Sequence, residues 1–302
     1  MPSKNSFDDT APAALPVFYR TYSRLVEGGR ETWDQVTDRT VAGISKLGKF
    51  TEAETALVRE MQEKQQVLPS GRWLWTGGTP WLDDPKNFSG SYNCTSTRVT
   101  DIQSLALMMD LAMMGSGTGA VIEDRHISKL PAVRNRIKVT DVGSFGGSGA
   151  KDRREHTYVS TRGNDVVIDC GDSRCGWVEA YEAFLDVAFS TEFDHTRPVL
   201  VHVDLSRVRS AGQKLKGFGG TSNPVRLPDL FPRLEKILNG AYGRQLTSVE
   251  VCLLIDEAAV TIVAGNIRRS AGMRQFSSDD EAAVGAKDNL WQQDDEGNWR
   301  ID

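Results

Sequence analysis

Four thiols are the side chains of this sequence best suited to redox chemistry: Cys94, Cys170, Cys175 and Cys252. Cys94 lies in the polar segment 91–96, whereas Cys252 lies in the apolar run 251–255. A cysteine that serves only for packing prefers apolar neighbours, so the setting of Cys94 favours a reactive thiol over a structural one. Cys170 and Cys175 flank a predicted turn and are interpreted as structural or incidental.

The same thiols do not indicate a metal site or a disulfide scaffold. No two of them have CxxC spacing, and the four histidines are scattered along the chain. A structural zinc site needs clustered ligands, and a disulfide framework needs more cysteines in a shorter chain. We therefore predict free thiols and no bound metal.

Two glycine-rich segments could let a ligand approach the backbone. Residues 115–119 read Gly-Ser-Gly-Thr-Gly, and residues 217–224 offer amides, two hydroxyls and one asparagine. Segments with few Cβ atoms suit contact with a phosphate, a ribose or a base. The first segment is neither a P-loop nor a GxGxxG motif, and tight structural turns remain the alternative for both segments.

Arg268 and Arg269 follow Gly265 after a long apolar stretch. Guanidinium forks suit phosphate groups, which makes the pair a candidate for nucleotide binding. A surface ion pair is the competing interpretation, and the spacing alone favours it.

The composition limits the partners of this chain. The formal net charge of −5 argues against a dedicated DNA-binding or membrane-binding face. A link to nucleic acid would therefore run through nucleotides. Residues 1–16 lack the apolar core of a signal peptide, and no apolar stretch is long enough to span a bilayer, so the cytoplasm is the expected location.

Periodicity and capping signals predict the elements that position these residues. Helices are expected over 18–25, 32–47, 51–66, 101–114, 177–189, 229–238 and 248–264, and strands over 120–122, 199–205 and 266–273. Thr51 and Glu54 are expected to form a capping box, and Pro232 to fall in the first turn of its helix. Residues 72–100 are interpreted as loops over Trp73, Trp75 and Trp81.

The order of elements after residue 100 alternates helices and strands, which predicts an α/β fold with parallel strands. Residues 140–165 are rich in glycine, serine and charge, and are expected to form a mobile or regulatory loop. Residues 277–302 are acidic and polar and are expected to form a surface segment.

Eight short motifs occur in a recognisable order, at residues 18–24, 31–33, 68–75, 92–94, 115–119, 126–131, 217–221 and 264–271. Their order and spacing resemble the adenosylcobalamin-dependent ribonucleoside-triphosphate reductases, especially the monomeric kind of bacteria and their phages. The resemblance runs from about residue 17 to about residue 280. No single motif is specific, but eight in order are.

The resemblance implies a ten-stranded α/β barrel made of two five-stranded halves, behind an N-terminal helical region. We therefore expect a flexible N-terminus at 1–16, the helical region at 17–67, the first half of the barrel at 68–276 with an effector-loop region near 135–170, and a polar segment at 277–302 at a truncation or split point.

The resemblance also implies the chemistry. In that family a thiyl radical made with adenosylcobalamin takes the 3′ hydrogen, the 2′ hydroxyl leaves as water, and two thiols supply electrons. Cys94 matches the first reducing thiol, at the end of the first barrel strand. The residues expected near the substrate are Ser70, Asn93, Gly117, Thr118 and Gly119. The expected specificity loop is Gly219, Gly220, Thr221, Ser222 and Asn223. Arg268 and Arg269 are expected to contact a phosphate group or to support a loop of the site.

The implied partners are a ribonucleoside triphosphate, a deoxynucleotide effector, a thioredoxin-like reductant and the C-terminal half of the reductase. The family's radical cysteine, its asparagine and glutamate companions and the second reducing thiol have no counterpart here, since no cysteine follows Cys252. We expect the chain alone to be inactive. A second polypeptide could complete it, splicing of an intein near Asp302 could join it to the missing half, or the sequence could be truncated. The alternative is an inactive or regulatory nucleotide-binding fragment.

Overall fold

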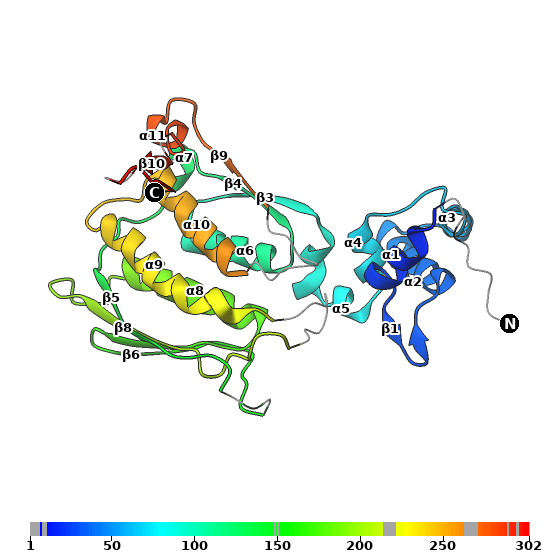
Figure 1. The fold of residues 1–302 in the computed structure, drawn as a ribbon, viewed down its shortest axis with the longest axis horizontal. Helices are drawn as coiled ribbons and strands as arrows, with labels where there is room; N and C mark the ends of the chain where they lie inside the picture. The colour runs from blue at the N-terminus through cyan, green and yellow to red at the C-terminus, as the bar shows by residue number, and fades with distance from the viewer. Residues whose placement is uncertain are drawn as a thin grey trace. The chain divides into compact units, whose positions relative to one another are not determined.

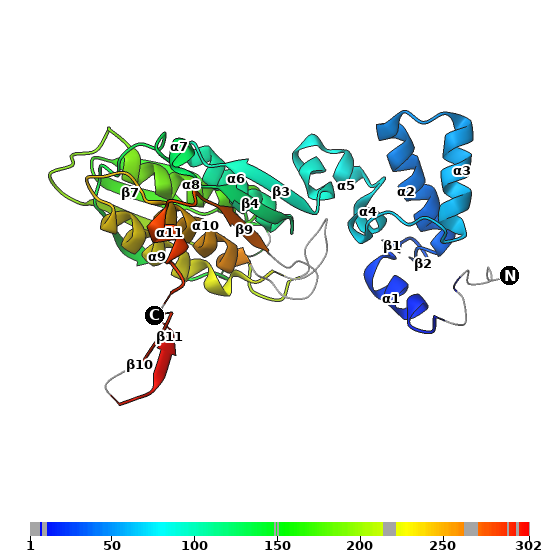
Figure 2. The same cartoon turned by 90° about the horizontal axis from the view of Figure 1, so that it is seen from above.

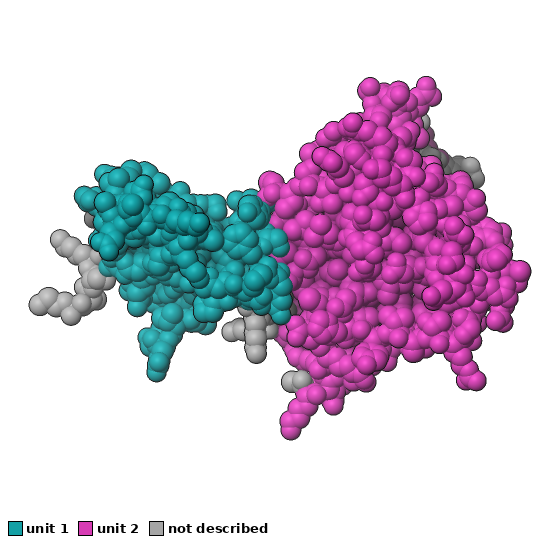
Figure 3. All heavy atoms as spheres, turned by 180° about the vertical axis from the view of Figure 1, so that it is seen from behind, with its two compact units in different colours: residues 1–93, 216–218 teal, residues 94–215, 219–302 magenta. Residues whose placement is uncertain are grey.

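The computed structural model describes residue 7 and residues 11–147, 149, 151–213, 222–262, 271–288, 290–293 and 296–301. The chain divides into two compact units, residues 1–93 with 216–218 and residues 94–215 with 219–302 (Figure 3). Each unit has a buried hydrophobic cluster of its own, so each is described by itself.

The first unit is helical apart from one short hairpin. Its elements are α1 (Ala14–Thr21), β1 (Leu25–Val26), β2 (Gly29–Arg30), α2 (Trp33–Gly48), α3 (Glu52–Glu63), α4 (Gly71–Thr76), α5 (Pro80–Asp83) and the 3₁₀ helix η1 (Pro85–Ser91). Phe18, Trp33, Val36 and Leu74 form its buried cluster. The helices predicted over 32–47 and 51–66 are confirmed as α2 and α3.

Local capping explains where α2 and α3 begin. The Thr32 hydroxyl accepts from the Gln35 amide while the Gln35 side chain accepts from the Thr32 amide. Thr51 and Glu54 make the same reciprocal pair, which confirms the predicted capping box. Because both bonds involve residues three apart, they depend on local sequence alone.

The prediction of loops over 72–100 is wrong. The segment forms α4, α5, η1 and β3 (Cys94–Arg98), because polar side chains cap each short helix. Ser70 and Thr79 accept from the amides of Trp73 and Leu82, respectively. The Trp73 side chain is buried, and its indole donates to the Thr40 carbonyl at 3.0 Å.

The second unit contains a small parallel sheet that begins at Cys94. Its strands are β3, β4 (Gly117–Val121) and β9 (Gly272–Gln275), in the order β3-β4-β9 (Figure 2). The helix α6 (Ile102–Met113) connects β3 to β4 and has Asp101, the first residue of the predicted helix, as its N-cap. The strand predicted over 120–122 begins earlier, at Gly117.

A separate sheet of four strands has the order β5-β8-β7-β6. The strands are β5 (Ile137–Val142), β6 (Tyr158–Arg162), β7 (Asp165–Asp169) and β8 (Val199–Asp204). The first, third and fourth of these run parallel, and β6 pairs antiparallel with β7. The expectation of a single loop over 140–165 is therefore wrong at both ends of that range, which belong to β5 and to β6 and β7. Strands with exposed polar faces have the same polar composition as a loop, so composition alone did not reveal them.

Helices lie between the two sheets (Figure 1). They are α6, α8 (Arg174–Phe189), α9 (Leu227–Gly240), which follows the 3₁₀ helix η2 (Pro224–Arg226), and α10 (Ser248–Ile262); the short α7 (Asp124–Ile127) follows β4. The helix α8 packs on β7, α9 packs on β5, and α6 packs on β3, β4 and α8. The predicted α/β class with parallel strands is confirmed.

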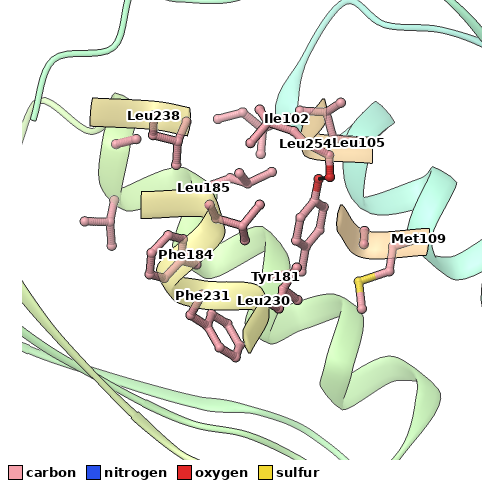
Figure 4. Packing of buried hydrophobic residues seen from close by; sticks show 14 of the residues in the cluster. Ile102, Leu105, Met109, Tyr181, Phe184, Leu185, Leu230, Phe231, Leu238 and Leu254 are labelled. Atoms are coloured by element: carbon pink, nitrogen blue, oxygen red, sulfur yellow. Dashed lines mark hydrogen bonds between the residues drawn. The ribbon is translucent and has the colours of Figure 1, made fainter. Parts of the chain in front are cut away.

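The core of the second unit lies where these helices meet (Figure 4). The Tyr181 hydroxyl on α8 donates to the Leu254 carbonyl on α10 at 3.0 Å. Phe184 and Phe231 join α8 to α9 with ring centroids 5.5 Å apart. Each fully buried side chain of this size contributes on the order of 2 kcal/mol through removal of apolar surface from water.

Pro232 lies inside α9, not in its first turn, because the helix begins at Leu227 with Pro228 in the first turn. The described residues form sheets of three and four strands and two short hairpins, so the five-stranded half of a barrel stays a prediction.

The chain after β9 forms α11 (Glu281–Val284) and a hairpin of β10 (Trp291–Gln293) and β11 (Trp299–Ile301). The Trp291 side chain is 59% exposed. Within the described residues, no helix is long and apolar enough to cross a membrane.

Candidate functional site

Cys94 is the first residue of β3 and lies opposite Gly117, the first residue of β4. Its thiol is exposed. Exposure alternates along β3, so Cys94 shares the exposed face with Ser96 and Arg98. A thiol on an open sheet face can be reached by a substrate and by a second thiol. The strand end that carries Cys94 is the amino end.

The structure brings Cys94 together with the glycine run. Gly117, Thr118 and Gly119 open β4, beside the first three residues of β3. A Cβ atom on Gly119 would lie 2.9 Å from the Thr95 carbonyl oxygen, so close approach of the strands requires glycine there. Thr118 is only 2% exposed and Gly119 is buried, which leaves Gly117 as the accessible backbone beside Cys94.

Ser70 and Asn93 have structural roles in the first unit. The Ser70 hydroxyl caps α4. The Asn93 side-chain oxygen accepts from Arg72 Nε at 2.8 Å, and Arg72 also donates to the Gly90 carbonyl. Arg72 thereby ties α4 to the segment that leads into Cys94, so both predicted residues help to shape that segment.

Of the predicted specificity loop, Gly219, Gly220 and Thr221 lie outside the described residues. Ser222 is buried, and its hydroxyl donates to the Ser210 carbonyl at 2.6 Å. The Gly212 amide donates to the Ser222 carbonyl, and the Ser222 amide donates to the Gln213 carbonyl. These three bonds join residues 210–213 to Ser222, and Asn223 then leads into η2.

Arg268 and Arg269 also lie outside the described residues, but a nearby arginine that the sequence did not single out holds the small sheet. Arg274 on β9 donates to the Thr118 carbonyl at 3.2 Å and pairs with Asp256 of α10 at 2.5 Å. Gly272 leaves room for this guanidinium, since a Cβ there would lie 3.0 Å from it. The sequence of β9, Gly-Met-Arg-Gln, carries no local signal for this role, because both partners of Arg274 are distant in the chain.

A second group of arginines was missed entirely. The arginine cluster consists of Arg153, Arg154, Arg207 and Arg209 with the carboxylates of Asp169 and Asp172. Each carboxylate is shared by two guanidiniums, at 3.0 and 3.0 Å for Asp169 and at 2.9 and 3.4 Å for Asp172. Four positive charges face these two negative ones, and the Asp204 carboxylate, which also interacts with Arg207, reduces the local excess to one.

The arginine cluster lies where ligands commonly bind in α/β folds. Asp169 ends β7, and Arg207 and Arg209 follow the end of β8. The carboxyl ends of parallel strands are the usual ligand edge of such a sheet. Asp172 is buried and fixed by Arg209 through its side chain and its carbonyl. The excess positive charge suits an anionic group such as a triphosphate.

The other three cysteines have less reactive surroundings. Burial raises the pKa of the Cys170 thiol to about 12. Burial also raises the pKa of Cys175 and that of Cys252, where the neighbouring Asp256 carboxylate adds to the effect. A protonated thiol is a poor nucleophile, so these environments separate the three from the exposed Cys94.

The described residues contain no group of three or more His, Cys, Asp or Glu side chains that could hold a metal ion. Two of the histidines already lie against carboxylates, His156 beside Glu179 at 2.7 Å and His202 beside Asp141 at 3.5 Å.

Comparison with known proteins gives consistent matches. Residues 140–238 match the family model of the B12-dependent ribonucleotide reductase insertion domain. A putative adenosylcobalamin-dependent ribonucleoside-triphosphate reductase of Mycobacterium phage D29 is 31% identical over 283 residues, which are 87% of this chain and 39% of the relative. The adenosylcobalamin-dependent ribonucleoside-triphosphate reductase of Lactobacillus acidophilus is 28% identical over 313 residues, 89% of this chain and 42% of the relative.

The fold comparison agrees. A crystal structure of a B12-dependent (class II) ribonucleotide reductase superposes with a TM-score of 0.71 at 24% identity, over 90% of this chain and 43% of that protein. At that identity the likeness supports the fold. The chain spans about two fifths of the length of the relatives it matches.

Proposed function

Since this chain is related in sequence, and similar in fold, to a part of the adenosylcobalamin-dependent ribonucleoside-triphosphate reductases, we propose that it supplies one reducing thiol and the effector region of such an enzyme. The observation that carries the proposal is the exposed Cys94 thiol at the amino end of β3, beside the Gly117 backbone. Ribonucleoside triphosphates are the substrates named for the relatives, and we propose them as substrates here.

The proposed reaction step balances with one further thiol. The Cys94 thiol and a second thiol lose two electrons and two protons and form a disulfide. The substrate's 2′ hydroxyl leaves as water, and a hydrogen takes its place on the ribose. Cys170 is buried beside β7, and Cys175 and Cys252 lie on α8 and α10. We therefore propose that the second thiol belongs to the part of the enzyme that these 302 residues do not contain.

The names of the relatives include adenosylcobalamin, and we propose that the complete enzyme uses this cofactor. When bound, adenosylcobalamin supplies the radical that starts the reaction. The corrin ring of that cofactor already ligates the cobalt, so the lack of a metal-binding cluster among the described residues does not bear on its binding. We assign no cofactor contact and no reaction step through the cofactor to this chain.

The arginine cluster is our proposed site for the phosphates of a deoxynucleoside triphosphate effector. Its four guanidiniums belong to the segment before β6 and to the segment after β8. Both segments fall within the residues that match the insertion-domain model. Arg154 is the most exposed of the four, and its guanidinium also lies 5.5 Å from the Tyr158 ring.

The thiol assignment is tested in the complete enzyme that contains this chain, by the rate of deoxyribonucleotide formation. Cys94→Ser should lower the rate by at least about a hundredfold, because a serine cannot enter the disulfide. Cys175→Ser is the matched control, since it removes a half-buried thiol of the same chain and should leave the rate within about twofold. Equal effects of the two substitutions would overturn the assignment.

The effector site is tested on the chain itself by titration with each of the four deoxynucleoside triphosphates. Arg154→Gln should weaken binding by about tenfold through loss of one charged contact. Arg244→Gln breaks an exposed ion pair with Glu250 on another face and should leave binding unchanged. Binding that is insensitive to Arg154→Gln would exclude the arginine cluster. Tight binding without activity in the complete enzyme would favour the alternative of a regulatory fragment.

A further inference from the structure

The segment that carries two arginines of the cluster is clamped onto the start of α8. The Ser173 hydroxyl donates to the Glu155 carbonyl at 2.5 Å, and the Asp172 amide donates to the Arg154 carbonyl at 2.7 Å. The Thr157 hydroxyl donates to the Gly176 carbonyl at 2.6 Å. These three hydrogen bonds hold residues 153–157 against the first turn of α8 and the two residues before it.

Backbone packing makes this clamp stiff. A Cβ on Gly171 would lie 2.6 Å from the Glu155 carbonyl oxygen, and a Cβ on Gly176 would lie 2.6 Å from Gly171 Cα. The two glycines allow backbones to touch without side chains between them. A displacement of residues 153–157 is therefore passed to the turn before α8.

The first residue of α8 reaches across to another helix. Arg174 pairs with Asp110 near the end of α6, and the two side chains are 20% and 23% exposed. Burial raises the pKa of Asp110, which means that the charged carboxylate depends on its partner in this place. A half-buried pair of this kind holds its geometry better than a surface pair.

The helix α6 is in turn the connection between the two strands of the candidate site. Three residues separate the end of β3 from the start of α6, and α6 packs on β3 and β4. Its last turn closes through the Met114 amide, which donates to the Asp110 carbonyl, and the left-handed Gly115 then leads into β4. Asp110 therefore stands one turn before the glycine run that lies beside Cys94.

We propose that the Asp110–Arg174 ion pair couples occupation of the arginine cluster to α6, and through α6 to the glycine run beside Cys94. The coupling rests on the proposed function, since it needs a triphosphate at the cluster. Arg174 and Asp110 act as positioning residues: they contact neither the effector nor the substrate. The path does not use the specificity loop.

Hydrogen exchange of the full 302-residue chain tests the coupling, with and without saturating deoxynucleoside triphosphate. In the unaltered chain, the triphosphate should slow exchange by at least about threefold both in peptides covering 151–176 and in peptides covering 102–121. In Asp110→Asn, binding and the slowing of 151–176 should persist, while the slowing of 102–121 is lost.

Two variants guard against a merely structural effect. Arg174→Lys keeps the charge and should retain part of the slowing over 102–121. Arg244→Gln breaks an ion pair elsewhere and should retain all of it. Slowing over 102–121 that survives in Asp110→Asn would overturn the coupling alone. If no deoxynucleoside triphosphate binds to the unaltered chain, the effector proposal and the coupling both fall.

Discussion

The two larger sheets of the second unit each carry a cysteine at the end of a parallel strand, one exposed and one buried. Cys94 opens β3 in the three-stranded sheet and has an exposed thiol. Cys170 follows β7 in the four-stranded sheet and is completely buried. The residue type and the place at a strand end are shared, so neither decides reactivity.

The two cysteines differ in exposure because other segments cover the end of β7 but not the exposed face of β3. Cys170 lies under the clamp between residues 153–157 and α8, next to Asp169 and Asp172, and burial raises the pKa of its thiol to about 12. Cys94 instead shares the exposed face of β3 with Ser96 and Arg98. Solvent access therefore separates a thiol suited to redox chemistry from one that serves packing.

The largest expected effect is on thiol alkylation. In the native chain at pH 8, Cys94 should react with iodoacetamide at least about a hundredfold faster than Cys170, because reagents need an accessible thiolate. Quantitative mass spectrometry of the modified peptides measures both rates. In 6 M guanidinium chloride the two rates should converge to within about threefold, since only the fold distinguishes them. Equal rates in the native chain would contradict the difference in solvent access between the two thiols.

A smaller effect is expected from the strand pairing that places Cys94. Gly119→Ala should lower the free energy of unfolding by about 1–3 kcal/mol, because the new Cβ meets the Thr95 carbonyl. Gly240→Ala is the control: nothing lies within 4 Å of a Cβ at that helix end, and the change should be about zero or slightly stabilising. Denaturant titration gives both values, and a neutral Gly119→Ala would contradict the close approach of β3 and β4.

The smallest effect concerns the pH dependence of stability. The folded state keeps the Cys170 proton up to a pKa of about 12, whereas the unfolded chain releases it near pH 9. The free energy of unfolding should therefore be independent of this thiol below pH 9 and fall as pH rises above it, by up to about 1.4 kcal/mol per unit. Cys170→Ala should give a flatter slope between pH 9 and 10.5 than the unaltered chain. Parallel slopes would show that Cys170 already ionises in the folded state.

Much of the helical framework could be predicted because its signals are local. The Thr51–Glu54 capping box, the start of α6 at Asp101 and the apolar period of α10 all follow from residues within a turn or two of one another. The short helices of residues 71–91 were missed, since glycine, proline and tryptophan in that segment resemble a loop until the polar caps are considered together.

The candidate site was predicted only in part. Cys94 and the glycine run were named separately, and the parallel register of β3 and β4 puts them side by side. The arginine cluster could not be read from spacing, because Arg207 and Asp169 are joined only by the pairing of β7 with β8. The same holds for Asp110 and Arg174, which belong to different helices and meet only when α6 packs on α8.

The proposed role of Cys94 requires that its thiol is oxidised when product forms. The complete enzyme, fully reduced, is allowed one turnover with a ribonucleoside triphosphate and adenosylcobalamin in the absence of external reductant, and its disulfides are then mapped by mass spectrometry. We predict one disulfide per product, joining Cys94 to a cysteine outside these 302 residues, with Cys170, Cys175 and Cys252 still reduced. Product formation with Cys94 still a free thiol would contradict the account.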